Sequence, residues 1–382
     1  MQIEQFRLEV REFLTSSLTA EMRAASACQL GLYSEPKIGR HWHRLLFEKG
    51  WITPTWPAEF GGAGWTGAQK YVFEQECARI EAPNLPAAAL LMCGPILITF
   101  GTPEQQQLFL PRIRSGEDYW CQGYSEPGAG SDLANLKCRA VREGDDYVVN
   151  GTKIWTTHAQ HANWIFMLVR TASNDRPQQG ITFLLANLAS PGISIKPIIS
   201  MSGEHEVNQV FFDEVRVPVR NRIGEENEGW SIAKRLLEFE RSGVYGPRTR
   251  RILARAERVA RASGGAWASR DFRRRFAEAC IEADVLEAGE LRMLGEANSA
   301  SSKTMYSILK LAGTETMQRA TELAVWASGT EAAYCARQDI DAGSGDEGAI
   351  SMARYLNTRA ATIYGGSSEV QRNILAKAAL GL

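Results

Sequence analysis

One acidic side chain stands where the sequence predicts a buried helix face. The predicted helix after Gly229 carries an apolar stripe at spacings of three and four residues, and Glu240 interrupts it. An unpaired carboxylate on such a face is costly unless it is neutralised or used, so Glu240 is a candidate general base. The alternative is an acid that reaches solvent or pairs across a helical bundle, and spacing alone favours neither. The apolar members of the stripe are Trp230, Ala233, Leu237 and Val244.

The neighbouring acid gives a contrast to Glu240. Glu238 points to another face of the same helix, with Arg235 and Arg241 three residues to either side. This spacing predicts ion pairs on a solvated face.

A glycine-rich loop, SEPGAGSD, occupies residues 125–132. Gly128 and Gly130 leave backbone N–H groups uncovered, and Ser125 and Ser131 add hydroxyls beside them. Such a loop can wrap a polar ligand closely. Taken alone, it is equally compatible with an ordinary solvated loop.

Short strands follow the loop and end in a polar aromatic corner. The pair Asn150-Gly151 predicts a tight hairpin. The strand after it ends in Trp155-Thr156-Thr157, whose flat ring and hydroxyls would suit one face of a planar, hydrogen-bonding ring such as a flavin. An ordinary strand is the alternative. His158 and His161 come next and could approach a cofactor rim, although a simple loop position is favoured.

Three regions position these residues. Helical periodicity covers residues 1–117, where Thr102 and Pro103 predict the N-cap and first residue of a helix. Alternating strands joined by tight turns at 118–224 predict a small β-barrel or sandwich. Long helical segments at 225–382 predict a bundle. The fold class is therefore α+β, with a β-barrel between two helical domains.

Composition excludes several functional classes. The chain has 382 residues, 44% of them hydrophobic, and a formal net charge of −1, which gives no reason to expect nucleic acid or an anionic membrane as a partner. The seven cysteines are scattered without metal-type spacing, and His41 and His43 diverge on a helix, so we expect no metal site. With no apolar stretch of ~20 residues and no signal peptide, reduced thiols in the cytoplasm are expected.

The glycine-rich loop at 125–132, the corner Trp155-Thr156-Thr157 and their order in the chain resemble the middle domain of the acyl-CoA dehydrogenase family. Two further segments resemble family signatures, WPAEFGG at 56–62 and IYGGSSEVQRN at 363–373, so the resemblance covers essentially the whole chain. It implies an FAD-dependent enzyme that converts an acyl-CoA to the trans-2-enoyl-CoA and passes electrons to electron-transfer flavoprotein. Two alternatives stay open beside this leading interpretation, an oxidase that uses oxygen and a non-catalytic subunit of such a complex.

The resemblance also implies which residue is the catalytic base. Many family members carry it as Tyr-Glu-Gly in the last loop, where this chain has Tyr364-Gly365-Gly366. A smaller branch places its glutamate on the first helix of the last domain, just before an arginine, and that position is Glu240. The resemblance then implies that Arg241 lies near the CoA and that the backbone N–H of Gly365 binds the thioester oxygen. A surface position remains the alternative for Arg241.

The resemblance also implies a set of FAD contacts. Ser131 is further implied to lie near the acyl-CoA, and Ser368 and Gln371 have capping-box spacing, so capping is the alternative role for this helix start. The implied FAD contacts are Gln122, Ser125, Gly130, Ser131, Trp155, Thr157, Ser367 and Glu369.

Two family motifs are not legible. Homotetrameric relatives reach a neighbour's FAD with Arg-x-x-Phe-Gly and Gln-x-x-Gly-Gly-x-Gly, whereas here Phe272 precedes Arg273 and only Gly329 of the second motif stands. In this respect the chain resembles two-subunit bacterial enzymes that act on steroid side chains and other bulky or dicarboxylic acyl-CoAs. We therefore expect an oligomer, α2β2 if a second acyl-CoA dehydrogenase-like subunit completes the cofactor site.

Overall fold

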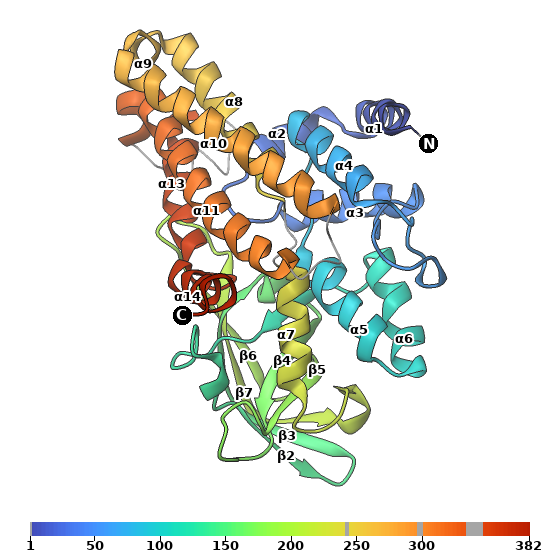
Figure 1. Cartoon of the computed structure of the whole chain (residues 1–382). Coiled ribbons are helices and arrows are strands. Elements are labelled where there is room, and N and C mark those ends of the chain that lie inside the picture. Colours follow the sequence, from blue (N-terminus) through green and yellow to red (C-terminus); the bar gives the residue numbers. More distant parts are fainter. Residues whose placement is uncertain (1, 241–243, 296–300, 334–346) are drawn as a thin grey trace.

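The computed structural model describes residues 2–240, 244–295, 301–333 and 347–382. Helices come first, then a β-sheet, then helices again (Figure 1). The predicted α+β fold, with a β domain between two helical regions, is confirmed.

The N-terminal helices begin at the residues that sequence chemistry favours. Thr102 caps its helix by accepting a hydrogen bond from the N–H of Gln105 at 3.3 Å, and Pro103 is the first helical residue, as predicted. A π-helical segment, Ala88–Cys93, precedes α5 directly. The helices are α1 (Ile3–Ser17), α2 (Ala20–Cys28), α3 (Pro36–Glu48), α4 (Gly67–Arg79), α5 (Gly94–Phe100) and α6 (Pro103–Ser115).

The β region forms one eight-stranded sheet in the order β6-β7-β3-β2-β4-β5-β8, with β1 pairing in parallel with β4. Helix α7 packs on β5 (Figure 1). The strands are β1 (Trp120–Gly123), β2 (Arg139–Glu143), β3 (Asp146–Thr157), β4 (Trp164–Arg170), β5 (Ile181–Asn187), β6 (Ile193–Ile198), β7 (Val207–Pro218) and β8 (Arg222–Ile223).

The predicted hairpin at Asn150-Gly151 is wrong. Strand β3 continues through both residues, and the register against β7 shifts between Val149 and Gly151, so the pair marks a β-bulge. The Asn150 amide bonds across the bulge to Glu214, with Nδ2 2.6 Å from Oε1. Gly151 has φ +148° and packs so closely on Cys138 that a Cβ would meet its Cα at 2.7 Å. The glycine thus serves close approach rather than chain reversal.

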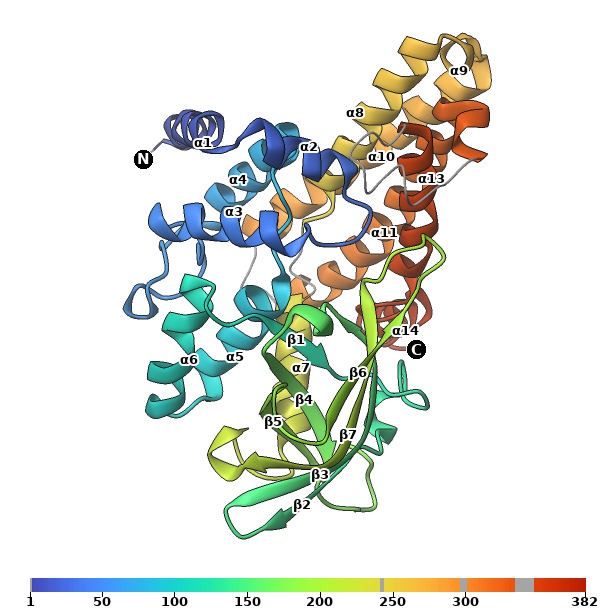
Figure 2. The same cartoon turned by 180° about the vertical axis from the view of Figure 1, so that it is seen from behind.

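The C-terminal helices form a bundle that lies beside the N-terminal helices, with α4 against α8 and α10 (Figure 2). The helices are α7 (Gly229–Glu240), α8 (Gly246–Ser263), α9 (Gly265–Ala268), α10 (Arg270–Gly295), α11 (Ser301–Ser328), α13 (Glu347–Thr358) and α14 (Ser368–Leu380). Among the described residues, no helix is long and apolar enough to cross a membrane.

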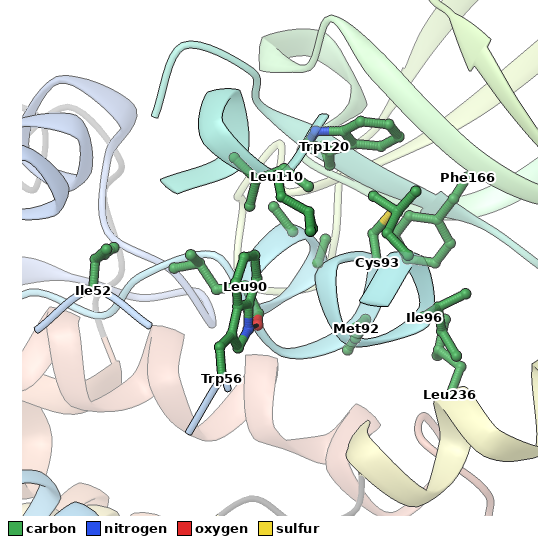
Figure 3. Close-up of a cluster of buried hydrophobic side chains, with 14 of the residues drawn as sticks. Ile52, Trp56, Leu90, Met92, Cys93, Ile96, Leu110, Trp120, Phe166 and Leu236 are labelled. Atoms are coloured by element: carbon green, nitrogen blue, oxygen red, sulfur yellow. Dashed lines mark hydrogen bonds between the residues drawn. The ribbon is translucent and has the colours of Figure 1, made fainter. Parts of the chain in front are cut away.

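The main core joins all three regions around the π-helical segment. Cys93 and Ile96 are fully buried against Phe166 of β4 and Leu236 of α7 (Figure 3). Because side chains from every region meet here, the segment Ala88–Cys93 is held from several sides at once.

Candidate functional site

A cavity lies where β1 and β3 end, and we call it the ring cavity. Gln122, Trp155 and Thr157 line it together. These are three of the residues implied to contact a flavin, and they come from two different strands. The wall is completed by side chains that include Tyr33, Ala88, Met92, Tyr119, Trp120 and His158.

Trp155 is held in an unusual state. Its backbone has φ +58°, in the left-handed region, and its side chain is 59% exposed. Both features cost free energy, because a bulky residue rarely adopts this conformation and a large indole gains by burial. Strained residues of this type cluster at functional sites, so Trp155 is a candidate ligand contact.

His158 also lines the ring cavity, in addition to occupying the turn that the sequence favoured. Its Nδ1 lies 2.6 Å from the hydroxyl of Tyr119. Burial, followed by repulsion from His161 and His205, lowers the pKa of His158 to about 4, so the imidazole is neutral at pH 7. A neutral imidazole has one N–H and one bare nitrogen, so Nδ1 either accepts a hydrogen bond from the Tyr119 hydroxyl or donates one to it, according to the tautomer.

The glycine-rich loop is fixed from below by a buried ion pair. Glu126, 7% exposed, accepts hydrogen bonds from Lys153 Nζ at 2.7 Å and from the N–H groups of Lys137 and Cys138 at 2.6 and 2.9 Å. Lys153 is fully buried on β3, two residues before Trp155. The loop and the corner are therefore parts of one bonded unit.

The outer side of this loop is open. A Cβ placed on Gly128 or Gly130 would meet no heavy atom within 4 Å, whereas Glu126 and Ala129 bond to each other's backbone at 3.0 Å and close the turn. Gly130 and Ser131 are exposed and do not line the ring cavity, and Ser125 is anchored through its carbonyl to the N–H of Ile154. The backbone of this loop is therefore uncovered on its outer side, where its N–H groups can bind the oxygen atoms of a ligand.

A second, larger cavity lies between the N-terminal helices and the start of α8, and we call it the apolar cavity. Aromatic and aliphatic side chains dominate its wall, which suits a hydrocarbon group. Among them are Trp42, Leu46, Trp51, Phe73, Leu90 and Leu91.

The two cavities share a wall. Ala88 and Met92 line the ring cavity, while Leu90 and Leu91 line the apolar cavity, and Pro86 lines both. All five positions belong to the π-helical segment or its approach, a type of helix distortion frequent at functional sites.

The motif WPAEFGG explains how this wall is held. The indole N–H of Trp56 donates to the carbonyl oxygen of Leu90 at 3.0 Å. A Cβ on Gly62 would meet the carbonyl oxygen of Trp56 at 1.7 Å, and one on Gly94 would meet the Trp56 ring at 2.1 Å. Both glycines are therefore required by the close packing of one tryptophan.

Glu206 is a residue that sequence reasoning missed. It is 7% exposed and accepts hydrogen bonds from the N–H of Leu32 and from Asn357 Nδ2, the latter at 3.1 Å, so it links all three regions. Burial raises its pKa. Its own carbonyl accepts the N–H of His158 at 2.9 Å. A lone Glu among short turns carries no sequence signal, because its partners are distant in the chain.

Gly365 and Gly366 have φ of +65° and +90°. A glutamate at position 365 would be strained there, which gives a backbone reason for glycine beyond the missing carboxylate. In the described part of the chain, no group accepts a hydrogen bond from the N–H of Gly365.

The helix after this turn starts at Ser368, but its N-cap is one residue earlier than the capping-box spacing suggested. Ser367, not Ser368, is the N-cap, and its side chain accepts the N–H of Val370 at 3.3 Å. Glu369 is exposed in the first turn. The hydroxyl of Ser368 and Oε1 of Gln371 are buried without a hydrogen-bond partner. Neither Ser367 nor Glu369 lines the ring cavity.

The side chain of Glu240 and the whole of Arg241 lie outside the described residues, as does the side chain of Glu238. The helix α7 itself runs to Glu240. Its buried face consists of Ile232, Ala233 and Leu236, so the apolar stripe is rotated slightly from the predicted one, which used Leu237. Position 240 follows Leu236 by four residues and is in helical phase with this face.

Phe272 does not reach outward. It is fully buried in the bundle, where its ring meets Trp326 at 5.5 Å. The phenylalanine of the incomplete Arg-x-x-Phe-Gly motif is therefore used for packing within this chain.

The donor set fits a flavin and offers nothing for a metal. Backbone N–H groups on an open loop suit a pyrophosphate, and an exposed indole with Gln122 and Thr157 suits a planar ring. Throughout the described ranges, no three His, Cys, Asp or Glu side chains gather as metal ligands, and the six described cysteines are free.

Models of three domains match the chain: "Acyl-CoA dehydrogenase, N-terminal domain" at residues 2–117, "middle domain" at 121–215 and "C-terminal domain" at 227–380. Among curated relatives, acyl-CoA dehydrogenase IpdE1 of Mycobacterium tuberculosis is 36% identical over 100% of this chain and 98% of its own length. Acyl-CoA dehydrogenase FadE26 of the same organism is 33% identical over 100% and 97%.

Solved structures agree with these matches. The chain resembles a subunit of the "Tcur3481-Tcur3483 steroid ACAD" with TM-score 0.86 and 29% identity, covering 100% of this chain and 97% of that one. It resembles a chain of the ChsE4-ChsE5 complex from Mycobacterium tuberculosis with TM-score 0.83 and 32% identity, over the same shares.

Proposed function

The chain belongs to the acyl-CoA dehydrogenase family, and we propose that it oxidises an acyl-CoA thioester to the trans-2-enoyl-CoA with FAD as cofactor. The observation that carries this proposal is the wall shared by the two cavities. A planar ring in one and a hydrocarbon group in the other would be separated only by the segment Ala88–Cys93. Hydride transfer requires donor and acceptor atoms about 3–3.5 Å apart, so the reacting carbons of the acyl group would lie beside the ring, on the ring-cavity side of this wall, and only the rest of the acyl chain would occupy the apolar cavity.

FAD would be held by residues from three parts of the chain. Gln122, Trp155 and Thr157 would border the ring, and the open loop would receive the pyrophosphate through its backbone N–H groups. When bound, FAD supplies the chemistry of accepting the β-hydrogen as hydride at N5. The members assigned to the loop and to the start of α14 are Ser125, Gly130, Ser131, Ser367 and Glu369.

Glu240 is the proposed base for the α-proton. Its position is in phase with the buried face of α7, and Gly365 supplies no carboxylate. The N–H of Gly365 would bind the thioester oxygen and stabilise the charge that develops there as the proton leaves. Arg241 would lie near the CoA portion, and Ser131 near the acyl-CoA.

The enzyme is proposed to act with a second, related subunit as an α2β2 assembly. Two similar solved structures are named for pairs of proteins, the Tcur3481-Tcur3483 steroid ACAD and the ChsE4-ChsE5 complex. In addition, Phe272 is committed to packing inside the bundle rather than extending to a neighbour. A steroid-derived or similarly bulky acyl group is the proposed substrate class, with electron-transfer flavoprotein as acceptor.

Gly365 favours a second candidate, a non-catalytic subunit that shares a cofactor site with its partner. One experiment separates the two. The chain is purified alone and with its candidate partner, its flavin content is measured, and acyl-CoAs of different bulk are added without oxygen. Loss of flavin absorbance with formation of enoyl-CoA supports the dehydrogenase. An assembly that reduces its flavin equally well with Glu240→Gln in this chain favours the non-catalytic role. In a parallel assay with air present, oxygen consumption would indicate an oxidase.

A further inference from the structure

The wall of the apolar cavity also carries cationic side chains. Among the residues that the structure describes, Arg248 and Arg251 of α8 and Lys70 of α4 line it, and Glu74 is the only carboxylate in the wall. Three cations against one carboxylate leave a formal charge of +2 at neutral pH. A cavity built only for hydrocarbon would gain nothing from such groups, because charges away from water are costly.

The arginines of α8 differ in how they are neutralised. Arg250 pairs with Asp284 and Glu287, and Arg255 lies 2.6 Å from Glu81. Arg251, by contrast, makes no hydrogen bond or ion pair with any residue that the structure describes, and the same holds for Arg248. Among the arginines of α8, only these two of the cavity wall form no ion pair with a described carboxylate, although Glu81 attracts Arg251 from a greater distance.

Arg251 is the more buried of the two. It is half-buried, whereas Arg248 is exposed at the rim. Burial, with repulsion from Arg255 and Arg248, lowers the pKa of Arg251 to about 10. Arg251 therefore stays charged at pH 7, and an anionic ligand beside it would stabilise that charge.

The start of α8 is fixed in place, so these side chains are presented in one arrangement. Glu290, 1% exposed, accepts the N–H groups of Tyr245 and Gly246 at 2.5 and 3.1 Å and the hydroxyl of Tyr71 at 3.1 Å. Its carboxylate is fully used by these donors and does not neutralise the arginines one turn later.

We propose that the apolar cavity takes an acyl group whose far end carries a carboxylate, bound by Arg251 with Arg248 at the rim. This inference rests on the proposed acyl-CoA dehydrogenase function and names its substrate class more closely. A guanidinium binds a carboxylate through two parallel hydrogen bonds, which fixes both the position and the length of the acyl group.

A phosphate of CoA is the other source of negative charge. Phosphate is the more strongly hydrated group, and Trp42, Trp51 and Phe73 in the wall could not replace its water. A carboxylate at the end of an apolar chain matches both parts of the wall, the aromatic part and the cationic side chains.

Binding of octanoyl-CoA, suberoyl-CoA and free CoA to the flavin-loaded protein tests this. The two thioesters have equal length and differ in the terminal carboxylate. We expect suberoyl-CoA to bind about tenfold more tightly, a preference that Arg251→Gln removes and Arg251→Lys retains in part. Arg250→Gln is the matched control, because Arg250 is already paired and does not line the cavity; it should leave the preference intact.

Equal binding of the two thioesters to the wild type overturns the proposal. So does an Arg251→Gln variant that weakens octanoyl-CoA, suberoyl-CoA and free CoA alike, since that pattern identifies a CoA phosphate contact. Binding is measured without turnover. If no thioester reduces the flavin, the proposed dehydrogenase function fails, while the ratio of the two affinities still decides the present inference.

Discussion

The ammonium nitrogen of Lys153 lies 2.7 Å from Oε1 of Glu126, and both side chains are buried. This pair joins the glycine-rich loop to the strand that carries Trp155. Lys153→Met leaves a carboxylate buried without its cation, so we expect a loss of about 3–5 kcal/mol in the free energy of unfolding and a protein that is purified with little flavin. Denaturant unfolding and the flavin-to-protein ratio measure the two effects.

Lys196 of β6 is exposed, so Lys196→Met is the matched control and should change neither quantity. The double variant Glu126→Gln with Lys153→Met should recover part of the stability, because it removes both charges. Full flavin content in Lys153→Met would show that the pair does not organise the loop.

Glu240→Gln tests the base. The amide keeps the shape of the side chain but cannot take the α-proton, so we expect FAD to remain bound and flavin reduction by acyl-CoA to slow by about 10³-fold. Rapid-mixing absorbance measurements follow the reduction. Glu238→Gln, two positions earlier, should reduce at the wild-type rate. Near-normal reduction in Glu240→Gln would place the base on another residue.

Trp155 combines backbone strain with an exposed ring that lines the ring cavity. Trp155→Gly relieves the strain of a non-glycine residue in the left-handed region, which is worth about 1 kcal/mol. The variant also exposes less apolar surface to water than the wild type. We therefore expect the flavin-free protein to gain thermal stability while FAD affinity falls by up to about tenfold from the lost stacking. Trp155→Ala, which keeps the strain, should lose the affinity without the gain. A glycine variant no more stable than the alanine variant would contradict the strain argument.

The carboxylate of Glu76 should make the stability of the N-terminal helices sensitive to acid. Burial alone would raise its pKa, but the arginines around it outweigh burial and lower the pKa to about 2. Because this value lies below the ordinary 4.5, the stabilisation is complete above pH 4.5 and is lost as the pH falls toward 2. The three arginines are Arg7, Arg11 and Arg79.

We expect Glu76→Gln to lower the free energy of unfolding by about 1–2 kcal/mol at pH 7, a figure reduced for solvent screening of the partly exposed arginines. The difference from the wild type should shrink between pH 4.5 and pH 2. Denaturant titrations across this range measure it. A difference that is independent of pH would show that the carboxylate charge is not responsible.

Local chemistry predicted the order of the regions well. Thr102 and Pro103 mark a helix start in any context, because a capping hydroxyl and a preset φ act within one turn. Asn150-Gly151 failed for the opposite reason. Its role depends on Glu214 and Cys138, which approach only in the folded sheet, so no local pattern separates a bulge from a turn.

The site was predictable where the resemblance supplied motifs and invisible where contacts are distant. Gln122, Trp155 and Thr157 do meet in one cavity. Tyr33, Tyr119 and Glu206 were missed, because a tyrosine in a loop or a glutamate before a strand acquires meaning only from partners far along the chain. The buried pair of Glu126 and Lys153 was missed likewise, since two residues 27 apart show no periodic signal.

The Trp56 indole holds the segment Ala88–Cys93 in place through its hydrogen bond to Leu90, and this segment contributes side chains to both the ring cavity and the apolar cavity. Substitutions at Leu90 and Leu91 therefore change the lining of the apolar cavity, whereas substitutions at Ala88 and Met92 change the lining of the ring cavity. The dimensions of one space can thus be redesigned from this segment without replacing a residue that lines the other.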